Sequence, residues 1–133
     1  MRLLDTNVLI FLALDRTRIS ARTMAVLSAR DAGLHASPVS AIEIAIKSSL
    51  GKLPLPLAFQ ADFKSAFLSL VDRMGATLLD VDLTAIAKLQ TLPLIHRDPF
   101  DRLLIAQALE YDLEIVSADR IFASYPGLKV LSA

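Results

Sequence analysis

Residues 2–14, RLLDTNVLIFLAL, carry the pattern that decides the fold. The segment RLL is typical of a short buried strand, and it stops at the polar triplet Asp5-Thr6-Asn7. The apolar run Val8–Leu14 then reads as a helix. Parallel strands need a crossover of this kind, in which a strand is followed directly by a helix. The N-terminal stretch therefore predicts an α/β fold.

The same alternation of strand and helix continues through the rest of the chain. Residues 51–56 must be extended or turning, because Pro54 and Pro56 cannot lie inside a helix. Further helices are expected at residues 20–33, 40–50, 57–74, 83–91 and 98–111, with one turn of helix near residue 121, and further strands at residues 34–36, 77–81, 114–117 and 128–131. This order predicts a mostly parallel sheet of four or five strands with helices on both faces.

Length and composition limit the class of protein. The 133 residues contain no repeat or linker, which predicts one domain over residues 1–133. Cysteine is absent, which excludes a disulfide scaffold, a zinc–thiolate site and a thiol nucleophile. The 14 basic and 14 acidic side chains cancel, so a nucleic-acid ligand would need locally concentrated positive charge. No membrane span or signal peptide is recognisable, so we expect a soluble cytoplasmic protein with no membrane partner.

Five acidic residues fall close to the ends of predicted strands. Asp5 follows the first strand, Asp119 lies two residues past the fourth, and Glu43 is in the first turn of the helix after the second. Asp98 and Asp101 begin the helix that leads to the fourth strand. Ligands of such sheets bind beyond the carboxyl ends of the strands. We therefore expect four separate segments to bring these acids to one edge of the sheet.

Each acid taken alone also has a structural interpretation. Ser40 and Glu43 have the spacing of a capping box, in which Glu43 accepts a hydrogen bond from the Ser40 amide. Asp98 before Pro99 is typical of a helix N-cap, and Asp101 is then in the first turn, where acids are favoured. Strand-end aspartates such as Asp5 and Asp119 can also be turn residues.

The acids taken together favour a metal site. Two carboxylates about 4–5 Å apart repel by roughly 4 kcal/mol at an effective dielectric constant near 20. A cluster of them therefore requires either raised pKa values or a cation. Magnesium and manganese prefer oxygen ligands of this kind. The spacing of an EF-hand loop is absent, which argues against calcium.

Polar and basic neighbours of the acids extend the predicted site. Side chains that could orient the carboxylates or their bound waters are Thr6, Asn7, Ser40 and Ser117. Basic side chains that could contact a phosphate backbone are Lys47, Arg97, Arg102 and Arg120. Lys47 has an alternative role in a helical ion pair with Glu43, four residues earlier. His96 is either a substrate contact or a loop residue, and His35, inside a strand, is expected to be structural.

These motifs resemble those of the PIN-domain nucleases, and more narrowly those of the VapC-type toxins of bacterial toxin–antitoxin pairs. The likeness spans nearly the whole chain through Leu3–Asn7, Ser40–Ile44, His96–Ala108 and Ser117–Asp119. It implies a PIN-like three-layer sandwich and an endoribonuclease that cleaves RNA phosphodiesters with water activated by Mg²⁺ or Mn²⁺. It also implies a cognate antitoxin protein as partner, and we expect a homodimer.

The resemblance allows two choices for one metal ligand. Asp101 matches the family's aspartate best by its spacing to Ala106 and Ala108, whereas Asp98 is an additional acid one helical turn earlier. If Asp98 caps the helix, Asp101 is the ligand. We therefore favour the set Asp5, Glu43, Asp101 and Asp119, with Asp98 kept as a further candidate.

Two other classes share part of the pattern. A response-regulator receiver domain also has acids at strand ends, and Asp80 or Asp82 could accept a phosphoryl group. That class needs a lysine after its last strand, whereas Lys129 lies within the last predicted strand here. A non-catalytic PIN-like protein-binding module would keep the fold without binding metal. For the toxin–antitoxin partnership that the resemblance implies, the segment Lys52–Pro56 could be an exposed docking loop.

Overall fold

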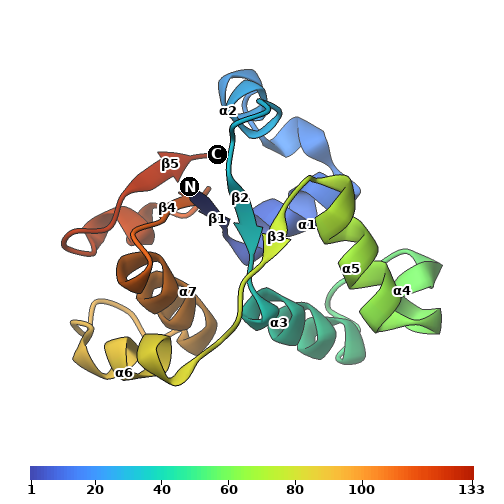
Figure 1. Cartoon of the computed structure of the whole chain (residues 1–133). Coiled ribbons are helices and arrows are strands. Elements are labelled where there is room, and N and C mark those ends of the chain that lie inside the picture. Colours follow the sequence, from blue (N-terminus) through green and yellow to red (C-terminus); the bar gives the residue numbers. More distant parts are fainter.

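The chain forms an open parallel sheet between two layers of helices (Figure 1). The computed structural model describes all residues from 1 to 133. The strands are β1 (Arg2–Leu4), β2 (Leu34–Ala36), β3 (Thr77–Leu78), β4 (Glu114–Ser117) and β5 (Val130–Ser132). The helices are α1 (Thr6–Leu14), α2 (Ala21–Leu27), α3 (Pro38–Ser49), α4 (Leu57–Ala61), α5 (Phe63–Arg73), α6 (Leu83–Thr91) and α7 (Pro99–Glu110), with 3₁₀ turns η1 (Arg16–Arg18) and η2 (Arg120–Ser124).

Successive residues of the two central strands point to opposite faces of the sheet and into separate cores. Leu4 and Val116 pack with side chains of α1, α2 and α5. Leu3 and Ile115 pack with side chains of α6 and α7. All four are fully buried, and Leu3 is paired with Ile115 as Leu4 is with Val116. The predicted α/β sandwich is therefore confirmed, and its five strands are all parallel.

The order of the strands places a crevice at the centre of the sheet. The order is β3-β2-β1-β4-β5, so β1 lies between β2 and β4. The chain leaves β1 towards β2 on one side and leaves β4 towards β5 on the other. Open α/β sheets bind ligands where the connections diverge in this way, beyond the carboxyl ends of the strands. Asp5 and Asp119, which follow β1 and β4, lie next to that point.

The predicted helix at residues 20–33 is wrong in length. Ser20 caps α2 as expected, its hydroxyl accepting a hydrogen bond from the Thr23 amide, but the helix ends at Leu27. Residues 28–31 are exposed, so a helix continued there would have no apolar face to bury on the sheet. Gly33, expected just past the end of that helix, instead leads into β2 with a positive φ of 61°.

The predicted helix at residues 57–74 is two helices. The chain breaks at Asp62, whose φ of −152° is extended and whose carboxylate accepts a hydrogen bond from the Ser65 amide. Asp62 is therefore an N-cap inside what the apolar pattern predicts as one helix. The predicted strand at residues 77–81 is also shorter, because the chain leaves the sheet edge after Leu78. None of the helices has the length and apolar character needed to cross a membrane.

The start of α3 overturns the predicted capping box. Ser37, not Ser40, is the N-cap, and its hydroxyl accepts a hydrogen bond from the Val39 amide at 3.1 Å. Pro38 occupies the first helical turn, where its missing N–H has no cost. Ser40 and Glu43 are therefore already inside the helix, and the Glu43 side chain is available for other contacts. The predicted cap of α7 by Asp98 is confirmed.

Candidate active site

Asp5 is the buried centre of the site. It ends β1 and is only 2% exposed, because α1 begins at the next residue and β4 lies alongside. The Ser117 hydroxyl at the end of β4 donates to Asp5 Oδ2 at 2.8 Å. Ser117 Oγ also accepts from the Asp119 amide at 3.0 Å. Ser117 thus ties the acids that follow the two central strands to one another.

Glu43 reaches the same region from α3. It is 6% exposed, and the Lys47 ammonium lies 2.7 Å from its Oε2, as the alternative interpretation of Lys47 predicts. The other carboxylate oxygen, Oε1, is buried and has no hydrogen-bond partner. It is the only buried side-chain polar atom in the chain that lacks one. A buried unpaired oxygen is costly, which indicates a place where a ligand atom is expected.

The two aspartates of α7 have different environments. Both Asp98 contacts use one oxygen, Oδ1, which accepts from the Phe100 amide at 2.9 Å and the Asp101 amide at 3.1 Å. Asp101 makes no capping contact, and its Oδ2 lies 3.3 Å from His96 Nε2. Asp98 therefore has the structural role that leaves Asp101 as the better candidate ligand.

Asp119 lies at the rim of the site. It is exposed, and its Oδ1 accepts from the Ile121 amide at 3.0 Å, which caps η2. Its negative charge nevertheless raises the pKa of Asp101, so the two carboxyl groups are neighbours. Asp119 thus combines the predicted turn role with a place at the edge of the cluster.

The acids lie close enough to raise one another's pKa values. Burial is the main cause that raises the pKa of Asp5 from 3.8 to about 7, with the negative charges of Asp101 and Glu43 also raising it. Burial likewise raises the pKa of Asp101 to about 7, together with the charges of Asp98, Glu43 and Asp119. Lys47 partly opposes this effect on Asp101. Strongly raised pKa values of grouped carboxyls are typical of functional sites.

Some of the predicted neighbours of the acids make contacts within the protein, and the others remain exposed. Thr6 and Ser40 are buried, and the Thr6 hydroxyl donates to Ser40 Oγ at 2.9 Å, which links the starts of α1 and α3. The Arg102 guanidinium is directed to the carbonyl oxygen of Pro93 and to the Tyr125 hydroxyl, so it stabilises the loop before α7. The side chains that remain exposed near the rim are Asn7, Arg97 and Arg120.

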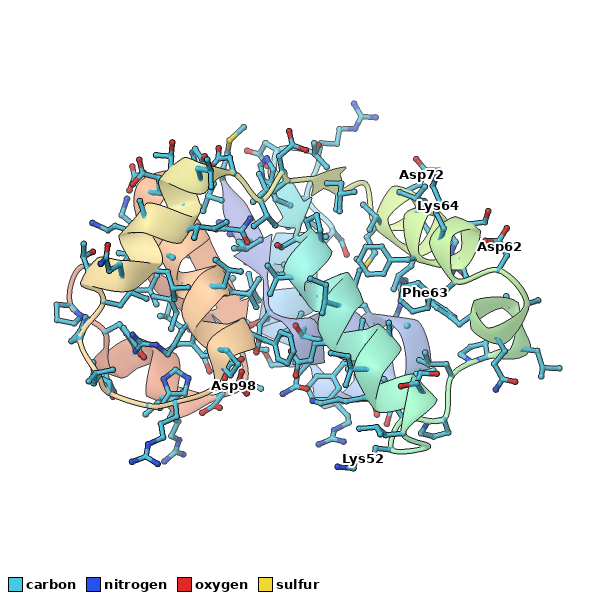
Figure 2. All side chains as sticks on the ribbon, turned by 90° about the horizontal axis from the view of Figure 1, so that it is seen from below. Lys52, Asp62, Phe63, Lys64, Asp72 and Asp98 are labelled. Carbon is cyan, nitrogen blue, oxygen red and sulfur yellow. The ribbon has the colours of Figure 1, made fainter.

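A cavity of about 300 Å³ adjoins the acids. Glu43 from α3 and Asp98 from the start of α7 line it, Ile46, Leu50 and Phe100 supply apolar walls, and two cations, Lys47 and Lys52, complete it. Figure 2 shows Asp98 at the start of α7 and Lys52 beyond the end of α3 along the same rim of the molecule. The acid cluster is thus open to a ligand that carries both negative charge and apolar surface.

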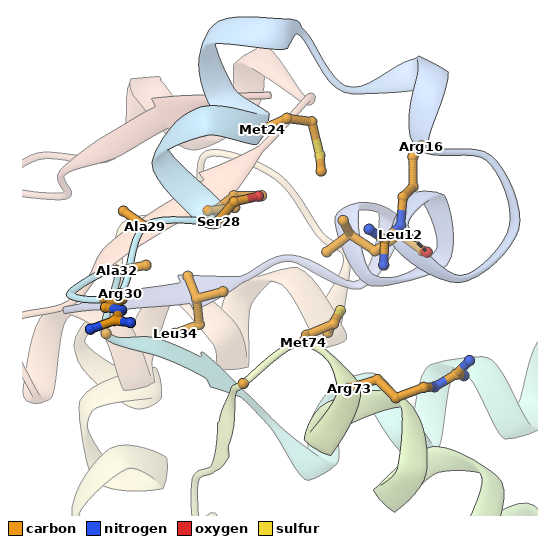
Figure 3. A pocket seen from close by; sticks show the side chains of 13 residues that line it. Leu12, Arg16, Met24, Ser28, Ala29, Arg30, Ala32, Leu34, Arg73 and Met74 are labelled. Carbon is orange, nitrogen blue, oxygen red and sulfur yellow. Dashed lines mark hydrogen bonds between the residues drawn. The ribbon is translucent and has the colours of Figure 1, made fainter.

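Figure 3 shows a second cavity, of about 370 Å³. It is bounded by Leu12, Met24 and Met74 among others, and none of the candidate acids lines it. Without a carboxylate or histidine it offers no group for acid–base or metal chemistry. The acid cluster is therefore the candidate active site, although the cavity beside it has a smaller volume than this second cavity.

Comparison with known proteins agrees with this fold. The family model described as "PIN domain" matches residues 2–128. The chain belongs to the PIN domain family. The matched range includes all five acids of the site. No curated protein sequence matches this PIN domain.

Solved structures share the fold at low sequence identity. One is a chain of the DNA-bound VapBC from Salmonella typhimurium, with a TM-score of 0.69 and 18% identity over 98% of this PIN domain and 96% of that chain. Another is a chain of VapBC2 from Rickettsia felis bound to a promoter DNA fragment, with a TM-score of 0.70 and 14% identity over 98% and 97% of the two chains. The family and the fold that the motifs predict are therefore confirmed.

The donor chemistry of the PIN domain fits a hard divalent ion. No three of its acidic or histidine side chains are close enough together to form a ready-made metal site. The unpaired Glu43 Oε1 and the raised pKa values of Asp5 and Asp101 nevertheless mark an excess of buried negative charge. An oxygen-only donor set of this kind is what Mg²⁺ and Mn²⁺ prefer.

Two polar residues near the site carry no clear signal in the sequence. Gln107 is fully buried on α7, where it accepts from the Ser37 hydroxyl at 2.6 Å and donates to the Asp80 carbonyl at 3.1 Å. The sequence signal that could have identified Gln107 is a polar residue on the face of a helix that is otherwise apolar. Tyr125 lies 2.6 Å from His96 Nδ1, and because 29 residues separate them no local pattern predicts the contact.

Proposed function

We propose that the chain is a divalent-metal-dependent endoribonuclease and the toxin of a toxin–antitoxin pair. The observation that carries the proposal is the gathering of Asp5, Glu43, Asp101 and Asp119 from four chain segments at the central crevice, with one buried carboxylate oxygen unpaired. Buried polar atoms with a purely structural role usually have a hydrogen-bond partner, so the unpaired oxygen supports a ligand-binding role. Membership of the PIN domain family supports the nuclease assignment.

The acids have distinct roles in this proposal. Asp5, Glu43, Asp101 and Asp119 would hold the ion, and Ser117 fixes the orientation of Asp5 through its hydrogen bond to Oδ2. When bound, a divalent ion supplies an activated water at neutral pH and neutralises charge that develops on the phosphate. The negative charge of the cluster also disfavours binding of RNA without the ion, because carboxylates and phosphate repel one another.

The cavity beside the acids is the proposed place of the RNA chain. Lys47 and Lys52 could neutralise phosphate groups, and the Phe100 ring together with Ile46 and Leu50 offers a surface for a base. The net charge of zero would not attract RNA over a long distance. Binding would therefore depend on these local lysines.

Incubation of the purified chain with total RNA tests the proposal. We expect cleavage in Mn²⁺ or Mg²⁺, none in excess chelator, and new ends that carry 5′-phosphates. Absence of cleavage under every metal condition would contradict the nuclease assignment. Sequencing of the new 5′ ends would also identify the class of RNA that is cut.

The toxin assignment has separate support and a separate test. The solved VapBC structures share the fold. Ile42 and Ile46 of α3 and its C-cap Leu50 are exposed at intervals of four residues, which gives an apolar stripe for an antitoxin or a second copy. We expect expression of the chain alone to arrest growth of a bacterial host, and expression of its Asp5→Asn variant to be harmless. Light scattering would decide whether the purified chain is the proposed homodimer.

A non-catalytic PIN-like protein-binding module is the alternative. It predicts the same fold and no binding of a divalent ion. Calorimetric titration with Mn²⁺ separates the two functions: binding with micromolar affinity supports the nuclease, and no measurable heat supports the module.

A further inference from the structure

A series of hydrogen bonds connects Asp101 to side chains outside the acid cluster. Arg102 Nη1 donates to the Tyr125 hydroxyl oxygen at 3.2 Å. That oxygen lies 2.6 Å from His96 Nδ1, and His96 Nε2 lies 3.3 Å from Asp101 Oδ2. The His96 ring packs edge-on against the rings of Phe122 and Tyr125.

The donor in each of these hydrogen bonds can be assigned by starting from Arg102. A guanidinium can only donate, so the Tyr125 oxygen accepts from Arg102 and keeps its single hydrogen for another partner. His96 Nδ1 is the acceptor within reach of that hydrogen. A neutral imidazole that accepts at Nδ1 carries its hydrogen on Nε2, which faces Asp101. The opposite arrangement would leave the hydroxyl hydrogen of the buried Tyr125 without an acceptor.

We propose that His96, fixed in its Nε2–H form by Tyr125, is a positioning residue that holds Asp101 in the acid cluster for a divalent ion. Without such a tether the Asp101 carboxylate would tend to rotate away, because Asp98, Glu43 and Asp119 all repel it. His96 binds one Asp101 oxygen and leaves the other free. The side chains of His96 and Asp101 are only 17% and 16% exposed, so water competes little for this contact.

The inference rests on the function proposed above only where the ion is concerned, and its first test needs no metal. The chain has two histidines, so nitrogen-15 NMR of the imidazoles is simple to assign with a His35→Ala variant. We expect His96 to show the Nε2–H form in the wild type, and Tyr125→Phe to give a mixture of both forms. A mixture, or the Nδ1–H form, in the wild type would overturn the tether.

Calorimetric titration with Mn²⁺ tests the effect of the tether on the ion. Loss of groups that orient metal ligands typically weakens metal binding about 10- to 100-fold, and we expect a loss in this range for His96→Ala. His96→Gln, which can donate an N–H from a similar position, should recover part of that affinity. His35→Ala is the matched control, because His35 contacts only backbone carbonyl oxygens of β1 and Gly33. Wild-type Mn²⁺ affinity in a folded His96→Ala variant would overturn the proposal.

The two proposals fail in different ways. A chain that binds Mn²⁺ through the His96-dependent site and cuts no RNA would refute the nuclease and support the tether. A chain that cuts RNA equally well with and without His96, with unchanged Mn²⁺ affinity, would refute the tether and support the nuclease. Thermal unfolding of each variant in chelator verifies that it is folded.

Discussion

Individual carboxylates in this site are placed at the expense of stability. Glu43 keeps a buried oxygen without a partner, and Asp5 and Asp101 hold their protons up to about pH 7 because they are buried next to other acids. A chain selected only for stability would replace such residues, since like charges in a poorly solvated place raise the free energy of the folded state. Stability and function should therefore respond in opposite directions when one acid is neutralised.

Asp5→Asn tests this opposition. The amide removes a buried charge and can still accept the hydrogen bond from Ser117. We expect RNA cleavage to fall by at least about 100-fold, and the melting temperature of the chelator-treated chain at pH 8 to rise by a few degrees. Cleavage assays and differential scanning calorimetry measure the two effects. Full cleavage by the purified variant would contradict the assignment of Asp5.

Asp98 and Asp101 are distinguished by a pair of matched substitutions. Asn is as good an N-cap as Asp, so Asp98→Asn should keep α7 intact and lose less than about 3-fold in activity. Asp101→Asn should abolish metal-dependent cleavage while the fold persists, because the His96 N–H can still donate to the amide oxygen. Activity that is lost in Asp98→Asn and kept in Asp101→Asn would reverse the choice of ligand.

At the scale of single elements, α3 shows how a helix start can join two parts of the molecule. Ser37 caps the helix and also donates to Gln107 on α7, 70 residues away. Ser37 and Ser40 are both fully buried at this end of α3, and the Ser40 hydroxyl oxygen accepts a hydrogen bond from the Thr6 hydroxyl. The beginning of α3 thus connects β2, α1 and α7 at the edge of the sheet where the acids lie.

Ser37→Ala measures the strength of this connection. The substitution removes the helix cap and leaves the Gln107 amide oxygen buried without its partner, which should lower the free energy of unfolding by about 2–3 kcal/mol. Urea unfolding measures the loss. Ser49→Ala is the control on the same helix, because Ser49 is exposed and should change stability by less than about 0.5 kcal/mol. An equal effect of both would mean that the Ser37 contacts contribute little.

The differences between predicted and observed elements have the same origin. The motif at residues 2–7 predicts β1, the start of α1 and the position of Asp5, because these are set by neighbours in sequence. Ser37 and Ser40 are both acceptable caps locally; Pro38 is a local signal that favours Ser37, whereas the contact of Ser37 with Gln107 is in no local pattern. The contact of His96 with Tyr125 cannot be predicted from a local sequence pattern either, because the two residues are 29 positions apart. The acids and Ser117, which orients Asp5, could therefore be predicted from local motifs, whereas the contacts that orient Asp101 could not.

At the scale of the whole molecule, the acid cluster couples stability to pH and metal. The folded pKa values of Asp5 and Asp101 lie near 7, above the ordinary 3.8 expected in the unfolded chain. Their contribution to stability is therefore full below about pH 4 and is lost as the pH rises towards 7. Four exposed aspartates have lowered pKa values, so they titrate below this pH range: the helix caps Asp15, Asp62 and Asp82, and Asp112, which is paired with Lys129.

The melting temperature in chelator should accordingly fall between pH 5 and pH 8, by more than about 5 °C. Saturating Mn²⁺ should compensate for the loss, so the stabilisation by metal should increase over the same range. Differential scanning calorimetry at four pH values, with and without Mn²⁺, measures both trends. A melting temperature in chelator that stays constant or rises with pH would show that the pKa values of Asp5 and Asp101 are not raised in the folded protein.

The central position of β1 has a consequence for synthesis of the chain. The hydrogen bond between Ser117 and Asp5 joins residues 112 positions apart, and β4 must be present before β1 has both of its neighbours. During translation β1 emerges long before β4, so a nascent chain that lacks β4 cannot assemble the edge of the sheet where the acids lie. The proposed nuclease activity would therefore appear only after Ser117 has been synthesised and β4 has paired with β1.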